Sequence, residues 1–159
     1  FVKNISVAAV IALAPIVGAL AVSGVPDPHL APAVFAGCLF REILMDISDL
    51  ESDKRNKILT LPVRYGKEFA LNVAGGAVFI MGLEASHGSS IQSIALGAGS
   101  SIWASTNLIL LKRDLGTISE KRSAKRALGS CKYITLIVLL SFLCEHSPNL
   151  AESLESALF

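Results

Sequence analysis

Charged side chains are scarce in this sequence, and the charges of the two signs almost cancel. Only 17% of the 159 residues are Asp, Glu, Lys or Arg, against about a quarter in an average soluble domain. The formal net charge is +1, so the chain lacks the positive field of a nucleic-acid-binding protein. Hydrophobic residues make up 52% of the chain and its mean hydropathy is +0.59, which favours a membrane protein.

Residues that commonly build sites in soluble proteins are also few. The three cysteines are isolated in the sequence and lack the spacing of a metal-ligand set. No glycine motif has the pattern of a phosphate-binding loop, and no acidic segment has the spacing and central glycine of an EF-hand. The three histidines, His29, His87 and His146, are distant in sequence from the main acidic cluster. We therefore expect interfacial or loop roles for them.

Long stretches without charge predict helices that cross a membrane. No charged residue occurs between residues 4 and 26, which is long enough for a helix across an apolar layer of about 30 Å. Four further apolar stretches follow it. We predict an all-α, multi-span membrane helical bundle over residues 1–145, with a tail at 146–159. The expected helices, about five in number, lie at 4–25, 29–47, 67–84, 91–111 and 127–145.

The absence of basic residues from alternate connections supports this topology. No Lys or Arg occurs in residues 22–29, in residues 84–90 or after residue 145. All fourteen lie at the N-terminus, in residues 41–67 or in residues 112–132. Positive charge collects on the cytoplasmic side of membrane proteins, so these three segments are expected to share that side. The pattern predicts an integral multi-pass protein but not its organelle; a plastid or another endomembrane is compatible.

The densest group of charges lies around the expected cytoplasmic loop at residues 46–66. Four acids spaced by four, three and four residues would share one face of a helix: Glu42, Asp46, Asp49 and Asp53. Like charges on one face destabilise a helix unless a cation binds between them. Mg²⁺ prefers oxygen ligands and combines one or two carboxylates with phosphate oxygens and water. We therefore predict a magnesium site with Asp49 and Asp53 as ligands and Asp46 as a further ligand or outer partner.

Basic residues lie beside these acids. Lys54 and Lys57, with Arg41 just before the acids, would supply positive charge to a diphosphate bound at the metal. Such a site beside an apolar bundle suits a substrate with a phosphate head and an apolar tail. Two alternatives stay open: a cation-conducting or transporting membrane protein with an acidic vestibule, and a non-catalytic membrane anchor.

One motif in this region resembles the second Asp-rich motif of the UbiA-type membrane prenyltransferases. It consists of Arg41-Glu42-Ile43, Asp46, Asp49, Asp53-Lys54 and Thr60-Leu61-Pro62-Val63. Its residues, in particular Arg41-Glu42-Ile43 and Thr60-Leu61-Pro62-Val63, most resemble those of the geranylgeranylglycerol-phosphate geranylgeranyltransferase branch. The resemblance implies nine membrane helices around a cavity, where two Asp-rich segments hold Mg²⁺ and a prenyl diphosphate. It also implies transfer of the prenyl group to a lipid or aromatic acceptor, with Asp49 and Asp53 as metal ligands.

The sequence departs from that family in one respect, because the first Asp-rich motif is absent. About five of nine helices are predicted, and the chain begins at Phe1 rather than Met. These features fit the C-terminal portion of an enzyme of isoprenoid lipid biosynthesis. Its expected partners are a prenyl diphosphate, a hydrophobic acceptor, membrane lipid and the missing N-terminal helices. A chain with one of the two Asp-rich segments is expected to be inactive alone. The sequence does not determine the acceptor or the length of the prenyl chain.

Overall fold

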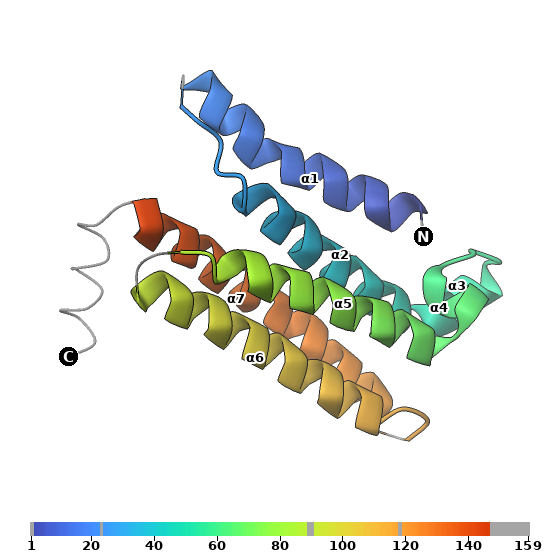
Figure 1. The fold of residues 1–159 in the computed structure, drawn as a ribbon. Helices are drawn as coiled ribbons and strands as arrows, with labels where there is room; N and C mark the ends of the chain where they lie inside the picture. The colour runs from blue at the N-terminus through green and yellow to red at the C-terminus, as the bar shows by residue number, and fades with distance from the viewer. Residues whose placement is uncertain (1, 23, 89–90, 118, 147–159) are drawn as a thin grey trace.

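The computed structural model describes residues 2–22, 24–88, 91–117 and 119–146, and this part of the chain folds into helices joined by loops (Figure 1). The predicted all-α fold class is confirmed. In chain order the helices are α1 (Val2–Ala21), α2 (Leu30–Ser48), α3 (Leu50–Arg55), α4 (Leu61–Tyr65), α5 (Lys67–Ala85), α6 (Ile91–Arg113) and α7 (Glu120–His146).

Four of these helices are long and apolar enough to cross a membrane, namely α1, α5, α6 and residues Glu120–Leu143 of α7. Helix α2 has 19 residues, a similar length, but its second half carries Arg41, Glu42 and Asp46. Four candidate spans are therefore found among the described residues where about five are expected, and the helix expected at 29–47 is α2, whose second half is charged. The predicted multi-span helical bundle is confirmed in this form.

The observed helix bounds differ from the predicted ones mainly at α1 and α7. Helix α1 ends at Ala21 rather than at residue 25, because the backbone N–H of Gly24 folds back to the carbonyl of Ala19, at 2.8 Å. Helix α7 begins at Glu120 rather than at residue 127. Its first turns are rich in Lys and Arg, which form helices well. A prediction based on apolar stretches places the start of the helix after these charged residues. The tail predicted at 146–159 lies outside the described residues except for His146.

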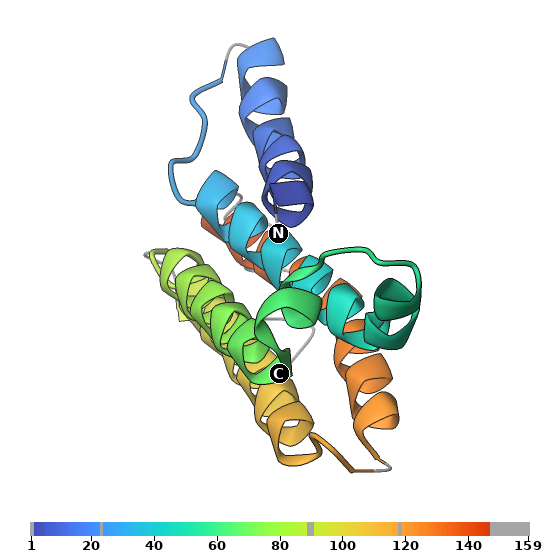
Figure 2. The ribbon, with the colours of Figure 1, turned by 90° about the vertical axis from the view of Figure 1, so that its right-hand side faces the viewer.

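Helix α2 lies at the centre of the bundle, between α1 on one side and α5 and α7 on the other, while α6 packs against α5 and α7 (Figures 1 and 2). Helix α7 buries residues at alternating intervals of three and four positions, which is the spacing of a coiled-coil-like seam. Many of these residues are small, so the helix backbones approach closely. The buried residues of this seam are Ala124, Ala127, Cys131, Ile134, Val138 and Ser141, and Ser123 is buried beside it.

Helix α1 is attached to the bundle through α2. Its buried residues, Asn4, Ala8 and Ala12, recur every four positions and form one narrow stripe. Large apolar side chains such as Val10 and Val17 cover its remaining surface and are exposed. Such a surface suits lipid or further apolar helices rather than water.

The bundle has two chemically different ends (Figure 1). One end, here called the basic end, contains the start of α1, the short helices α3 and α4, and the connection between α6 and α7. The other, here called the histidine end, contains the connection between α1 and α2, the end of α5, the start of α6 and the end of α7. The predicted loop at 46–66 lies at the basic end and is partly helical, since it contains the last turn of α2 together with α3 and α4.

Candidate functional site

The acidic segment lies where α2 ends and α3 begins. Asp49 caps α2 with φ −96° and ψ 5°, and its backbone N–H donates to the carbonyl of Met45 at 2.9 Å. The backbone N–H of Asp53 in turn donates to the carbonyl of Asp49, also at 2.9 Å. Asp49 and Asp53 are therefore one helical turn apart in the structure, at the spacing that the sequence pattern predicts.

Asp46 lies inside the bundle, with only 5% of its side chain exposed. Its Oδ2 accepts a hydrogen bond of 2.7 Å from Nδ2 of Asn4, and Nζ of Lys3 lies 4.0 Å from its Oδ1. Asp53 is close enough for its charge to act on Asp46. Asp46 thus fastens α1 to α2. The sequence analysis does not single out Asn4 as a site residue, although it is the polar residue on the small-residue stripe of α1.

Asp49 and Asp53 are in a different environment. Asp49 is exposed and Asp53 is half-buried. Within the described residues, neither carboxylate is seen in a hydrogen bond or ion pair. The carboxylates of Asp46, Asp49 and Asp53 do not form a compact set either. Metal ions in proteins are commonly bound by His, Cys, Asp and Glu side chains. In the described part of the chain, one group of three such side chains has its ligand atoms within 4.8 Å of one another: His29, Glu84 and His87.

Arg41 is paired within α2. Its Nη1 lies 2.9 Å from Oε1 of Glu42, whose side chain is buried. Arg41 and Asp46 are five positions apart in the sequence, which corresponds to about 140° around a helix. Arg41 and Asp46 therefore lie on different faces of α2, and in this arrangement Arg41 compensates the charge of Glu42.

Lys54 and Lys57 lie on and just after α3, at the basic end. Lys54 approaches Glu51 at 3.9 Å, and both side chains are largely exposed, so this pair contributes little to stability. Lys57 has a positive φ of 55°. The N–H of Ile58 donates to the carbonyl of Asp53 at 2.8 Å, and the N–H of Lys57 to that of Lys54 at 3.2 Å. These two bonds form a Schellman motif with Lys57 in the left-handed position.

A cavity of about 580 Å³ opens beside these residues at the basic end. Lys54, Tyr65, Lys67 and Glu68 line part of its wall. Lys67 also forms an ion pair with Glu120, which ties the start of α5 to the start of α7. Because Glu120 already compensates the charge of Lys67, Lys54 is the lysine of this wall that suits an anionic group.

The segment before α4 contains an unusual buried hydroxyl. Oγ1 of Thr60 is buried and, among the described side-chain atoms, it is the one buried nitrogen or oxygen without a hydrogen-bond partner. Leu61 and Pro62, which follow it, are buried and begin α4. The Thr60-Leu61-Pro62-Val63 segment of the sequence motif is therefore an anchor for the chain where it turns back into the bundle.

The donor chemistry of the acidic segment fits a magnesium ion. All its candidate ligands are carboxylate oxygens, and Mg²⁺ binds through one or two carboxylates together with water and phosphate oxygens. The exposure of Asp49 and the absence of partners at Asp53 among the described residues leave both carboxylates available. Asp46 is already bonded to Asn4, which suits an outer partner better than a direct ligand.

Apolar helices of spanning length, with a charged segment at one end, define the class of this molecule: it is an integral, multi-pass membrane protein. The model of the UbiA prenyltransferase family matches residues 1–129. The chain belongs to this family.

Curated relatives carry one name. The chain is 30% identical over 145 residues to digeranylgeranylglyceryl phosphate synthase of Pyrococcus abyssi, which covers 90% of this chain and 51% of the relative. It is 30% identical over 144 residues to the protein of that name from Pyrococcus furiosus, with 89% and 50% covered. The chain thus spans about half the length of these relatives. No solved structure matches it.

Proposed function

We propose that this chain is part of an integral membrane prenyltransferase that transfers a prenyl group from a prenyl diphosphate to a hydrophobic acceptor. Membership of the UbiA prenyltransferase family supports the reaction class. The observation that carries the proposal is the pair Asp49 and Asp53, which lie one helical turn apart at the basic end. Two available carboxylates beside lysines are suited to a metal ion and a diphosphate.

In this proposal Asp49 and Asp53 hold Mg²⁺, and Asp46 orients the site from inside the bundle. When bound, Mg²⁺ supplies positive charge that stabilises the leaving diphosphate. Lys54 and Lys57 add charge-assisted hydrogen bonds to the diphosphate oxygens. Arg41 is the weakest member of the set, because Glu42 already engages its guanidinium group.

The proposed reaction breaks the bond between C1 of the prenyl chain and the diphosphate oxygen. Pyrophosphate leaves with the bonding electron pair, so positive character develops on the allylic C1. A nucleophilic atom of the acceptor forms the new bond to C1 and loses its proton to solvent or a base. The residues of the basic end act on the negative charge that grows on the leaving group, which is the charge that an enzyme must stabilise most.

The name of the relatives suggests which donor and acceptor to assay first. It describes the synthesis of a glyceryl phosphate that carries two geranylgeranyl groups. We therefore propose geranylgeranyl diphosphate as donor and geranylgeranylglyceryl phosphate as acceptor for the first assays. Aromatic acceptors are the comparison set.

The other half of the proposed enzyme would come from helices outside this chain. The relatives are about twice as long as the matched segment, and the exposed apolar surface of α1 offers such helices a place to pack. They would supply the first Asp-rich motif, which this sequence lacks. The cation-conducting alternative has less support, because the described acids gather at the helix ends instead of recurring along a path through the bundle.

The direct test replaces a metal ligand in the full-length protein. We expect Asp49→Asn and Asp53→Asn each to lower Mg²⁺-dependent geranylgeranyl transfer by about 100-fold or more, as loss of a group that stabilises developing charge typically does. The matched control is Glu51→Gln, an exposed acid on the same short helix. Transfer of labelled prenyl group is measured across a range of Mg²⁺ concentrations. Wild-type activity in Asp49→Asn would overturn the proposal.

A further inference from the structure

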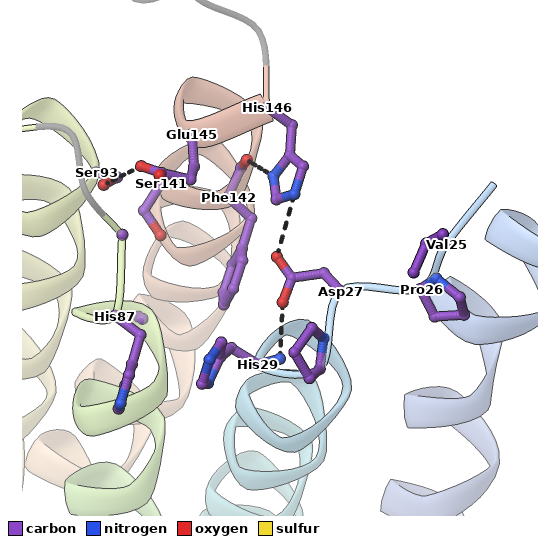
Figure 3. A pocket seen from close by; sticks show the side chains of 13 residues that line it. Val25, Pro26, Asp27, His29, His87, Ser93, Ser141, Phe142, Glu145 and His146 are labelled. Carbon is purple, nitrogen blue, oxygen red and sulfur yellow. Dashed lines mark hydrogen bonds and ion pairs between the residues drawn. The ribbon is translucent and has the colours of Figure 1, made fainter.

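All three histidines of the sequence gather at the histidine end, far from the acidic segment, although 58 and 59 positions separate them along the chain: His29, His87 and His146. They line one cavity of about 430 Å³ between the connection before α2, the end of α5, the start of α6 and the end of α7 (Figure 3). The topology places all three histidines on one side of the membrane, but it does not predict that they line one cavity.

Two of these histidines form a compact cluster with an acid. One ligand atom each of His29, Glu84 and His87 lies within 4.8 Å of the other two. The rings of His29 and His87 are stacked, with centroids 4.3 Å apart and planes inclined by 13°. Nδ1 of His29 lies 2.8 Å from Oε2 of Glu84. The cluster therefore joins the N-terminus of α2 to the C-terminal part of α5.

Each of the two rings can offer one nitrogen to a metal. Nδ1 of His87 lies 2.8 Å from the carbonyl oxygen of Leu83, and a carbonyl can only accept, so the proton is on Nδ1 and the lone pair on Nε2. Nδ1 of His29 lies next to Oε2 of Glu84, so these two atoms face one point, where a metal ion can replace the proton that they share. Metal-binding histidines commonly donate their second N–H to a carbonyl or carboxylate, as His87 does.

The surroundings of the cluster favour a cation. Asp27 and Glu145 line the same cavity, while no Lys or Arg occurs in residues 22–29 or 84–90 of the sequence. The position of His29 is fixed, because its backbone N–H donates to Oδ1 of Asp27 at 2.7 Å. His146 lies 3.5 Å from the other oxygen of Asp27 and so belongs to the outer wall of the cavity (Figure 3).

We propose that His29, Glu84 and His87 bind a divalent transition-metal ion of the Zn²⁺ type at the histidine end. Two imidazole nitrogens and one carboxylate oxygen suit Zn²⁺ and not Mg²⁺, which prefers oxygen alone. Ligand atoms around a tetrahedral Zn²⁺ are roughly 3.3 Å apart, while those of the cluster lie within 4.8 Å of one another. A bound ion therefore draws them together and turns the two stacked rings toward one point. The exposed His87 at the end of α5 can make this adjustment. The bound ion fastens α2 to α5.

The test is a titration of the untagged chain in detergent with Zn²⁺, followed by calorimetry. We expect one ion bound per chain, and a rise in Tm on binding, since an ion that binds the folded state stabilises it. Co²⁺ is the spectroscopic probe, because its visible absorption reports nitrogen ligands. Excess Mg²⁺ should not displace either ion.

Two variants locate the site. We expect His87→Ala and Glu84→Gln to lower the Zn²⁺ affinity by at least tenfold, because even residues that only orient a metal ligand commonly contribute about 10- to 100-fold. His87 is exposed, so its replacement leaves the helix packing intact. The matched controls are His146→Ala, in the same cavity but outside the cluster, and Asp49→Asn at the basic end.

Both controls, His146→Ala and Asp49→Asn, should bind Zn²⁺ as the wild type does and keep the rise in Tm. His87→Ala should lose that rise. The proposal is overturned if the wild-type chain binds no Zn²⁺, or if His87→Ala binds it with unchanged affinity. Loss of binding in Asp49→Asn with full binding in His87→Ala would assign the ion to the basic end and equally reject the histidine cluster.

Discussion

At the scale of single residues, Lys57 stands out for its backbone. Its φ of 55° is the one positive value of a residue other than glycine in the described part of the chain. A side chain in the left-handed region costs roughly 1–2 kcal/mol, and glycine usually takes this position in a Schellman motif. Residues kept in unfavourable backbone conformations occur often at functional sites. In Lys57 the strained position and the predicted diphosphate contact coincide.

We expect Lys57→Gly to stabilise the fold by about 1 kcal/mol, because glycine adopts a positive φ without a steric cost. If Lys57 binds the diphosphate, the same variant should weaken prenyl diphosphate binding. Unfolding of the chain in detergent measures the first effect, and calorimetric titration of the full-length protein the second. The control is Asn56→Gly, at the preceding residue with φ −88°, where glycine relieves no strain. A lower stability of Lys57→Gly would contradict the structural interpretation.

At the scale of helices, the contact between α5 and α6 depends on two glycines. A Cβ added at Gly97 would lie 2.3 Å from the carbonyl oxygen of Ala85, and one added at Gly82 would lie 2.3 Å from Oγ of Ser101. The backbone of α6 therefore passes close to the end of α5. In contrast, a Cβ at Gly99 would meet nothing within 4 Å.

Gly97→Ala should separate α5 from α6 and destabilise the bundle by about 1–3 kcal/mol, which is the usual cost of overpacking a close interface. Backbone atoms cannot move aside as a flexible side chain does. Gly99→Ala, two residues along the same helix, should be neutral or slightly stabilising, because alanine favours a helix over glycine. Thermal unfolding of both variants in one detergent makes the comparison. Equal Tm values for the two would refute the close contact at Gly97.

The helices also differ in how well the sequence predicts them. Apolar length and alternating basic loops predict the long helices, because lipid requires apolar helices of this length and positive charge collects on one side of the membrane. Helix ends were less accurate, since the charged first turns of α7 continue a helix beyond its apolar part. The segment at 46–66 was expected as a loop, yet α3 and α4 form there through local capping and the buried Leu61.

In the candidate site, local features are predictable from the sequence and contacts between distant residues are not. The spacing of Asp49 and Asp53 was predictable, because both residues belong to one local helical turn. The bond between Asn4 and Asp46 joins residues 42 positions apart, and the bond between His29 and Glu84 joins residues 55 positions apart. Such pairs depend on how helices pack against one another, and no local pattern encodes that packing.

At the scale of the whole molecule, the chain is polarised between two ends. The basic end carries the acidic segment and most of the lysines and arginines, while the histidine end carries the imidazole cluster and no described lysine or arginine. The chain spans about half the length of its curated relatives. The charge balance of the proposed site therefore involves only one of the two Asp-rich segments that the family resemblance implies.

We expect the isolated chain to transfer no geranylgeranyl group, because a single Asp-rich segment leaves most of the diphosphate charge uncompensated. The chain is reconstituted in lipid with Mg²⁺, geranylgeranyl diphosphate and geranylgeranylglyceryl phosphate, and the product is followed with a labelled donor. The relative from Pyrococcus furiosus, treated identically, is the positive control. Turnover by the isolated chain that disappears in Asp49→Asn would show that one Asp-rich segment suffices. In that case the second Asp-rich segment is dispensable for turnover, while Asp49 is still required as a metal ligand.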